Sequence, residues 1–204
     1  MLHGQTAWLL GTFNPIHAGH LTMATTALAQ FGLQQVVLVP AGNSPWKHTD
    51  SAMTPCHKRV ATIKKTIAGI EGVIVDAIEC DWATQHPAEP TFSWYTLQYL
   101  KEKHAITGRI PIIMGSDTVA GLARWALPPK VSPSWWANEL CIVQAPRQGN
   151  PWVSDLVVNQ NTYPLNTVAL EMPLVNISST QLRGATLDLR PEDEPEQSAG
   201  WMGF

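Results

Sequence analysis

Residues 7–24 read AWLLGTFNPIHAGHLTMA, and this stretch decides the fold. It opens with the short apolar run Ala7–Leu10, which is typical of a buried strand. A helix-like stretch follows from Ala18 to Phe31 and stops at Gly32, a residue type that tolerates the left-handed backbone found at helix ends. A strand followed directly by a helix predicts the first unit of a parallel α/β sheet.

The same alternation continues along the chain. Five further strands are expected in the apolar runs Val36–Val39, Val73–Ile78, Ile110–Met114, Leu140–Val143 and Thr167–Leu170. Further helices are expected over Pro55–Ala68 and Ser93–Lys103, with shorter ones after Asp117, Pro151 and Ser178. We expect Thr54 to cap the helix that starts at Pro55, since proline needs no hydrogen-bond partner at the first helical position. The pattern predicts a Rossmann-like α/β fold, with a parallel sheet of about six strands and helices on both faces.

Length and charge narrow the class of protein. The 204 residues fit one domain, and only 14% of them are charged, with a net charge of -3. Such a surface disfavours nucleic-acid binding, which needs a basic patch. The acids gather near the end of the chain, so we expect a domain over residues 1–187 and an acidic, flexible tail over residues 188–204.

The cysteines and the N-terminus indicate a compartment. Cys56, Cys80 and Cys141 lie far apart, without a C-x-x-C pair or a histidine at zinc spacing. We therefore expect neither a disulfide framework nor a structural metal site. The N-terminal apolar run lacks a basic flank, and nowhere do about 18 apolar residues follow one another. The expectation is a soluble cytoplasmic protein that does not bind a membrane.

Two histidines mark a candidate phosphate site. His17 and His20 stand at the start of the first expected helix, where free backbone N–H groups and the helix dipole attract anions. Residues three apart share one helix face, so both rings can donate to one phosphate. Gly19 between them leaves room for a nucleotide close to the backbone.

A second candidate phosphate site lies near the end of the chain. The segment ISSTQLR, residues 177–183, places three hydroxyls before a short helical stretch and an arginine after them. Ser178 can cap the helix, and Arg183 can bring a planar guanidinium to the same phosphate oxygens. The loop 40–54 directly follows the second expected strand, at a strand end where ligands bind in such sheets.

Taken together, these segments resemble the H-x-G-H nucleotidyltransferase superfamily. The nearest match is the bacterial nicotinate-nucleotide adenylyltransferase family, and it covers roughly residues 6–187. Four segments carry the resemblance, namely GTFNPIHAGHL at 11–21, VPAGNSPWK at 39–47, GSD at 115–117 with Trp125, and ISSTQLR at 177–183.

The resemblance implies an enzyme of NAD synthesis that joins ATP and nicotinate mononucleotide, giving deamido-NAD and pyrophosphate. It implies Mg²⁺ carried mainly by the ATP phosphates, without a dedicated protein metal site. Transfer to nicotinamide mononucleotide or to another phosphorylated acceptor, such as phosphopantetheine, remains open. So do a regulatory nucleotide-binding module without turnover and a homo-oligomeric assembly.

The resemblance also assigns roles to residues. The implied catalytic residues are His17, His20, Lys47 and Arg183. The implied ATP and phosphate contacts are Gly11, Thr12, Phe13, Gly19, Gly115, Asp117, Ile177, Ser178, Ser179 and Thr180. The implied mononucleotide contacts are Asn14, Trp94, Thr96 and Trp125, with Trp82 as a further candidate for stacking on the pyridine.

Simpler interpretations of some residues stay open. Asp117 also suits the N-cap of a helix after Gly115, and Lys47 suits a solvated loop charge. Arg59 and Arg147 are candidates for phosphate contacts or for plain surface residues. The two histidines could alternatively bind zinc, although no third ligand stands nearby in the sequence.

Overall fold

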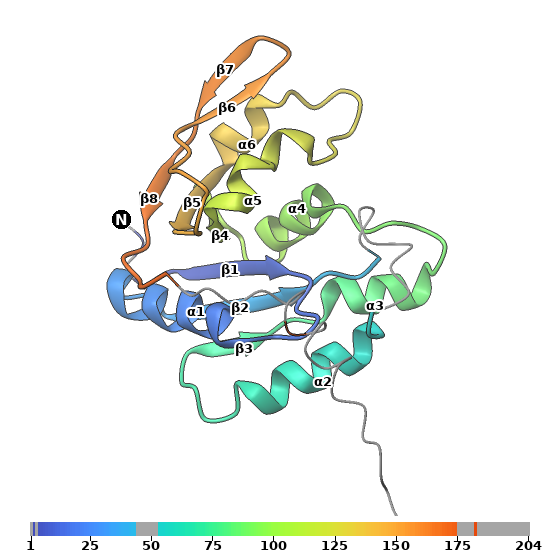
Figure 1. Cartoon of the computed structure of the whole chain (residues 1–204). Coiled ribbons are helices and arrows are strands. Elements are labelled where there is room, and N and C mark those ends of the chain that lie inside the picture. Colours follow the sequence, from blue (N-terminus) through green and yellow to red (C-terminus); the bar gives the residue numbers. More distant parts are fainter. Residues whose placement is uncertain (1, 3, 44–52, 175–181, 183–204) are drawn as a thin grey trace, which may run out of the picture.

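The computed structural model describes residues 2, 4–43, 53–174 and 182. Its centre is a sheet of six parallel strands in the order β3-β2-β1-β4-β5-β8 (Figure 1). These strands are β1 Thr6–Gly11, β2 Gln35–Pro40, β3 Val73–Val75, β4 Ile110–Gly115, β5 Leu140–Ala145 and β8 Thr167–Ala169. The predicted Rossmann-like fold is confirmed.

Helices cover both faces of this sheet. They are α1 Ala18–Phe31, α2 Cys56–Thr66, α3 Ile78–Gln85, α4 Ser93–Lys103, α5 Ser116–Ala120 and α6 Ser134–Glu139, with a 3-10 turn at Leu122–Arg124. Buried side chains of α1 and α2 belong to the core on one face, and those of α4, α5 and α6 belong to the core on the other. An antiparallel hairpin of β6 Asp155–Val158 and β7 Asn161–Pro164 lies outside the main sheet.

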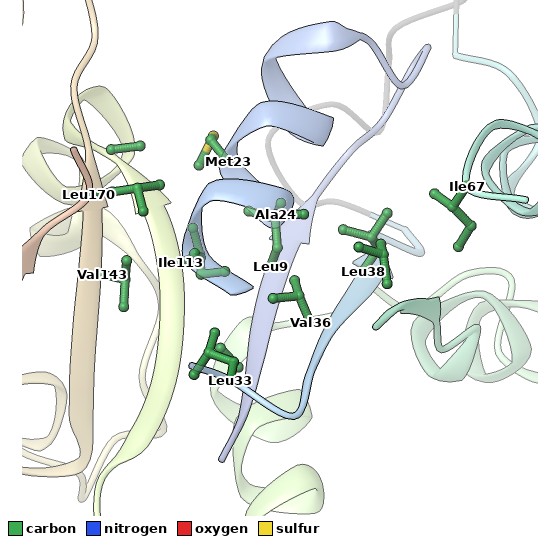
Figure 2. Close-up of a cluster of buried hydrophobic side chains, with 14 of the residues drawn as sticks. Leu9, Met23, Ala24, Leu33, Val36, Leu38, Ile67, Ile113, Val143 and Leu170 are labelled. Carbon is green, nitrogen blue, oxygen red and sulfur yellow. The ribbon is translucent and has the colours of Figure 1, made fainter. Parts of the chain in front are cut away.

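The alternation of side chains along β1 builds two cores. Ala7 and Leu9 face α1, whereas Trp8 faces the opposite layer, because successive residues of a strand point to opposite faces. Figure 2 shows Met23 and Ala24 of α1 beside Leu9 in the first core. All five of these side chains are at most 3% exposed, so β1 is buried on both faces of the sheet.

Three local predictions need correction. The run predicted as one strand over Val73–Ile78 ends as a strand at Val75, and α3 begins at Ile78. The Asp76 carboxylate accepts the N–H of Ile78 at 3.0 Å, which turns the chain there. No helix follows Pro151, because the next element is the hairpin strand β6. The helix predicted from Pro55 starts one residue later, with Pro55 rather than Thr54 at the N-cap.

The prediction that the cysteines stay unpaired is wrong. Cys56 at the start of α2 and Cys80 in α3 form a disulfide, with their Cα atoms 5.5 Å apart. They are 24 positions apart in the sequence, and only the packing of α2 and α3 around the end of β2 brings them together. Cys141 is a free, half-buried thiol. Within the described residues, no helix is long and apolar enough to cross a membrane.

Candidate active site

The candidate site lies where the carboxyl ends of β1, β2 and β4 meet. In the sheet β1 lies between β2 and β4, and the chain leaves β1 toward β2 before returning to β4 on the other side. Such a switch in strand order opens a crevice at the carboxyl ends of the strands, where ligands bind in this kind of fold. Residues 11–20 enter this region from β1, and Gly115 enters it from β4.

His17 and His20 form a stacked pair at the start of α1. Their ring centroids are 3.7 Å apart at an interplanar angle of 29°, and the Phe13 ring meets the His20 ring edge-on at 4.8 Å. His17 is the N-cap, and its backbone N–H donates to Nδ1 of His20 at 3.3 Å. Because Nδ1 accepts this hydrogen bond, a neutral His20 carries its proton on Nε2. That tautomer makes Nε2 a hydrogen-bond donor.

The His17 side chain is buried and has an unused polar atom. It is 8% exposed, and its Nδ1 has no hydrogen-bond partner among the described residues. Burial lowers the pKa of His17 below its ordinary value of 6.5, and the positive charge of Arg147 lowers it further. The ring is therefore neutral at pH 7. A buried polar atom without a partner is costly, so this one marks a place where a ligand or an ordered water is expected.

Arg147, just after β5, provides a second unused donor. Its Nε is buried without a hydrogen bond to any described residue, and it lies 3.8 Å from the Asp117 carboxylate. Its backbone N–H donates to the Ser116 hydroxyl at 3.1 Å, which ties the arginine to α5. A guanidinium whose charge acts on the pKa of His17 makes this corner attractive to an anion.

Asp117 and Gly115 lie next to Arg147. Gly115 is the N-cap of α5, so the alternative interpretation of Asp117 as the cap is wrong. The Asp117 side chain is 52% exposed and faces Arg147 instead. A Cβ on Gly115 would meet the side chains of Asp117 and Arg147, so these two side chains pack directly against the Gly115 backbone.

Arg59, for which the sequence left open a phosphate contact or a surface position, is buried and joins two loops. The side chain is 3% exposed, and it donates to the carbonyls of Thr54 at 2.9 Å, Thr12 at 2.6 Å and Ala41 at 2.6 Å. Asn14, expected to contact the mononucleotide, is 2% exposed and accepts the N–H of Thr54 at 3.2 Å. These bonds connect the loop after β1 to the loop after β2. The buried Arg59 therefore holds the two loops that border the site in place.

Glu79 is a second buried charge that the sequence analysis missed. Its carboxylate accepts the N–H of Gly42 at 3.1 Å and the hydroxyl of Thr96 at 2.7 Å. Burial raises the pKa of Glu79, and these hydrogen bonds together with the charge of Arg59 oppose the rise. Thr96, expected at the mononucleotide site, is thus 7% exposed and engaged inside the protein. An acid within the apolar stretch Ala77–Cys80 was the available signal.

The two favoured tryptophans belong to one aromatic cluster. Trp94 packs 6.0 Å from Trp135, Trp135 packs 4.9 Å from Trp136, and Trp136 packs 5.7 Å from Trp125. The indole Nε1 of Trp94 is buried without a partner among the described residues. Trp82 stacks on His86 at 4.5 Å, away from this cluster. Trp94 and Trp125 therefore remain the candidates for stacking on a pyridine.

Several predicted site residues lie outside the described residues. They are Lys47, Ile177, Ser178, Ser179, Thr180 and Arg183. The described part of the chain contains no group of three histidine, cysteine or acidic residues that could hold a metal ion.

Comparisons with known proteins identify the family of this chain. The family model described as cytidylyltransferase-like matches residues 8–185. A protein of Roseiflexus castenholzii named "probable nicotinate-nucleotide adenylyltransferase" is 32% identical over 193 residues, which are 94% of this chain and 90% of that protein. A Rubrobacter xylanophilus protein of the same name is 33% identical over 144 residues, covering 68% of this chain and 60% of that protein.

A solved structure supports the fold independently. The nicotinic acid mononucleotide adenylyltransferase of Plasmodium falciparum, solved with NaAD, superposes with a TM-score of 0.67 at 16% identity. The match covers 89% of this chain and 83% of that one. With the paired histidines after β1 in place, the chain belongs to the cytidylyltransferase-like family and, within it, to the nicotinate-nucleotide adenylyltransferases.

Proposed function

We propose that this protein transfers the adenylyl group of ATP to nicotinate mononucleotide. An oxygen of the mononucleotide phosphate attacks the α-phosphorus of ATP, and the bond from that phosphorus to the bridging oxygen of the β-phosphate breaks. The products are deamido-NAD and pyrophosphate. The attacking phosphate is already anionic, so the protein's task is to align the reactants and to stabilise charge at the α-phosphate.

The observation that carries the proposal is a pair of buried nitrogens without a hydrogen bond to any described residue, one at the start of α1 and one just after β5. Nδ1 of His17 and Nε of Arg147 come from elements far apart in the sequence, yet the charge of Arg147 acts on the pKa of His17. Both lie near a helix N-terminus, which itself favours anions. A phosphate bound here would satisfy both atoms, and Nε2 of His20 would donate to the same group.

The remaining roles follow from position. Gly11, Thr12 and Phe13 line the turn between β1 and α1, and Gly19 lies in the first turn of the helix. We assign them to the ATP side of the site. Lys47 is proposed to meet the reacting phosphates, and Ser178, Ser179, Thr180 and Arg183 to hold the β- and γ-phosphates.

The described side chains fit a magnesium ion carried by ATP. Mg²⁺ keeps several waters and needs only one or two carboxylates, and the half-exposed Asp117 beside Arg147 offers one. When bound, the ion neutralises charge on the triphosphate. His17, His20 and Arg147 would donate hydrogen bonds to phosphate oxygens of the bound nucleotide.

The test is pyrophosphate release by purified protein with Mg-ATP. It is run with nicotinate mononucleotide, with nicotinamide mononucleotide and without acceptor. We expect release that needs a pyridine nucleotide and a higher kcat/KM for the nicotinate form. Equal or higher kcat/KM for the amide would reverse the substrate assignment. ATP binding without release, from folded protein, would replace the enzyme with a nucleotide-binding module.

A further inference from the structure

The disulfide between Cys56 and Cys80 lies against the strand end that leads into the site. Sγ of Cys56 is 3.3 Å from the carbonyl oxygen of Ala41, and Sγ of Cys80 is 3.6 Å from that of Pro40. These two carbonyls are consecutive and stand at the carboxyl end of β2. The disulfide therefore joins α2 to α3 beside the end of β2, where the chain leaves the sheet. The loop that follows contains Lys47, for which a catalytic role is predicted.

Both oxidation states fit this place. In the disulfide each Sγ lies within 3.6 Å of a carbonyl oxygen, and after reduction these oxygens would be acceptors for the two S–H groups. Neither thiol would be left as a buried donor without a partner, which would otherwise oppose reduction. Cys80 is 4% exposed and Cys56 is half-buried, so a small thiol reaches Sγ of Cys56 first.

The same strand end is held by the two buried charges. Arg59, one turn after Cys56, donates to the carbonyl of Ala41, and Glu79, next to Cys80, accepts the N–H of Gly42. A Cβ on Gly42 would overlap the carbonyl group of Glu79, so the backbone segments of β2 and α3 are in close contact there. A change in the distance between α2 and α3 is thus transmitted to residues 41 and 42.

We propose that Cys56 and Cys80 form a reversible redox site, which low-molecular-weight thiols such as glutathione open and close, and which sets how firmly the end of β2 is held. A glutathione thiolate attacks Sγ of Cys56, the bond to Cys80 breaks, and Cys80 leaves as a thiolate. A second glutathione thiolate attacks the glutathione sulfur of the mixed disulfide and releases Cys56 as a thiolate. Oxidised glutathione forms, and the protons that the two glutathione thiols gave up neutralise the two cysteine thiolates.

The first experiment counts thiols in the intact, folded protein. The Cys141→Ser variant leaves only the two cysteines in question, and it is equilibrated in glutathione buffers from fully reduced to fully oxidised. Acid quenching, alkylation and mass spectrometry then give the fraction of disulfide. We expect one reversible two-electron transition that is reached from both directions. A disulfide that resists reduction until the protein unfolds would overturn the proposal, and so would two free thiols in every buffer.

The second experiment measures how firmly the end of β2 is held, and it needs no substrate. Hydrogen exchange is followed in peptides covering residues 38–43 in the oxidised and the reduced Cys141→Ser protein, with residues 110–115 of β4 as an internal control. We expect exchange in the β2 peptide to be at least about threefold faster after reduction, while β4 is unchanged. The oxidised form should also melt several degrees higher, because the disulfide closes a loop in the unfolded chain. Equal exchange of the β2 peptide in both states would refute the coupling to the strand end.

A third measurement rests on the proposed function. Pyrophosphate release is compared for both redox states, and we expect reduction to raise KM several-fold with little change in kcat, since the strand end positions substrate and His17 is untouched. Equal KM values in both states would refute the link from the strand end to substrate binding. The absence of turnover in both states would count against the proposed function alone, since the first two experiments need no substrate.

Discussion

At the residue scale, the site depends on polar atoms that the protein leaves unpaired. His17 is 8% exposed, and burial is the larger of the two causes that lower its pKa. The charge of Arg147 is the other cause, although 130 positions separate the two residues in the sequence. A neutral ring that donates or accepts without changing its charge suits the alignment of phosphates near pH 7.

Replacing His17 by alanine tests its role in the transition state. We expect kcat to fall by about a hundredfold while the protein stays folded, because a preorganised donor is removed from the reacting phosphate. Pyrophosphate release measures the rate, and circular dichroism checks the fold. His57→Ala is the matched control, since His57 is exposed on α2. Near wild-type turnover in folded His17→Ala protein would remove this histidine from the mechanism.

Replacing Arg147 by alanine tests the electrostatic coupling. Arg147 lowers the pKa of His17, so its removal should raise that pKa, though not fully to 6.5, because burial remains. Titration of the His17 ring signals by NMR measures the change. Arg109→Ala, which removes an exposed arginine, should leave the His17 titration unchanged. An unchanged His17 pKa in Arg147→Ala would show that the two groups do not interact.

At the element scale, the loops after β1 and β2 are joined by buried charges rather than by apolar packing. Arg59 contacts carbonyls of both loops, and Glu79 links the loop after β2 to α4 through Thr96. Such bonds need a charged donor or acceptor in the interior, which is costly unless every polar atom is paired. What the buried charges provide is a loop geometry that is already defined before substrate binds.

Arg59→Ala should therefore destabilise the protein strongly. Three charge-assisted hydrogen bonds are lost, and we expect the free energy of unfolding to fall by about 3 kcal/mol or more. Urea denaturation measures it, and the neighbouring exposed Lys58→Ala serves as the control. A loss under about 1 kcal/mol would mean that the bonds contribute little to the folded state.

Glu79→Gln should change how stability depends on pH. Burial raises the pKa of Glu79 above 4.5, so between these two values the folded state binds more protons than the unfolded state. Its contribution to stability is therefore lost as pH rises from about 4.5 through the raised pKa. The glutamine variant lacks this dependence, and urea denaturation at a series of pH values measures the difference. The exposed Glu102→Gln should keep the wild-type profile.

At the scale of the whole molecule, the two cores pack against both faces of β1, and the site residues lie at the carboxyl ends of the strands. His17, Gly115 and Arg147 come from the connections after β1, β4 and β5, and these strands are neighbours in the sheet. We propose that the catalytic unit lies within residues 1–187, because the motif ISSTQLR ends at Arg183, and that catalysis does not need residues 188–204.

Removal of residues 191–204 tests that division. The segment is acidic, contains two prolines and lacks apolar periodicity, so we expect its loss to leave kcat/KM within about twofold. Steady-state kinetics of the truncated and the full-length protein measure the ratio. A fall of tenfold or more, in truncated protein with an unchanged melting temperature, would place the tail at the substrate site.

Local patterns in the chain were sufficient for the fold and for part of the site. The six strands and helices α1 and α4 were predicted because apolar runs and glycine stops are read from neighbouring residues. The stacked histidines were predicted together because they share the first turn of one helix. The hairpin β6–β7 was missed, since its strands are only 4 residues each and largely exposed.

Sequence alone determined the order of strands and helices along the chain and the turn that carries the paired histidines, because each depends on residues that are close along the chain. It also indicated the family, because the family motifs are read directly from the residues. Only the tertiary structure decided the partners of Arg59, Arg147 and Glu79 and the pairing of Cys56 with Cys80. The Arg59 bond to Thr12 spans 47 positions, and the Arg147 bond to Ser116 spans 31. Contacts over such separations depend on how the strands order themselves in the sheet, which local periodicity does not encode.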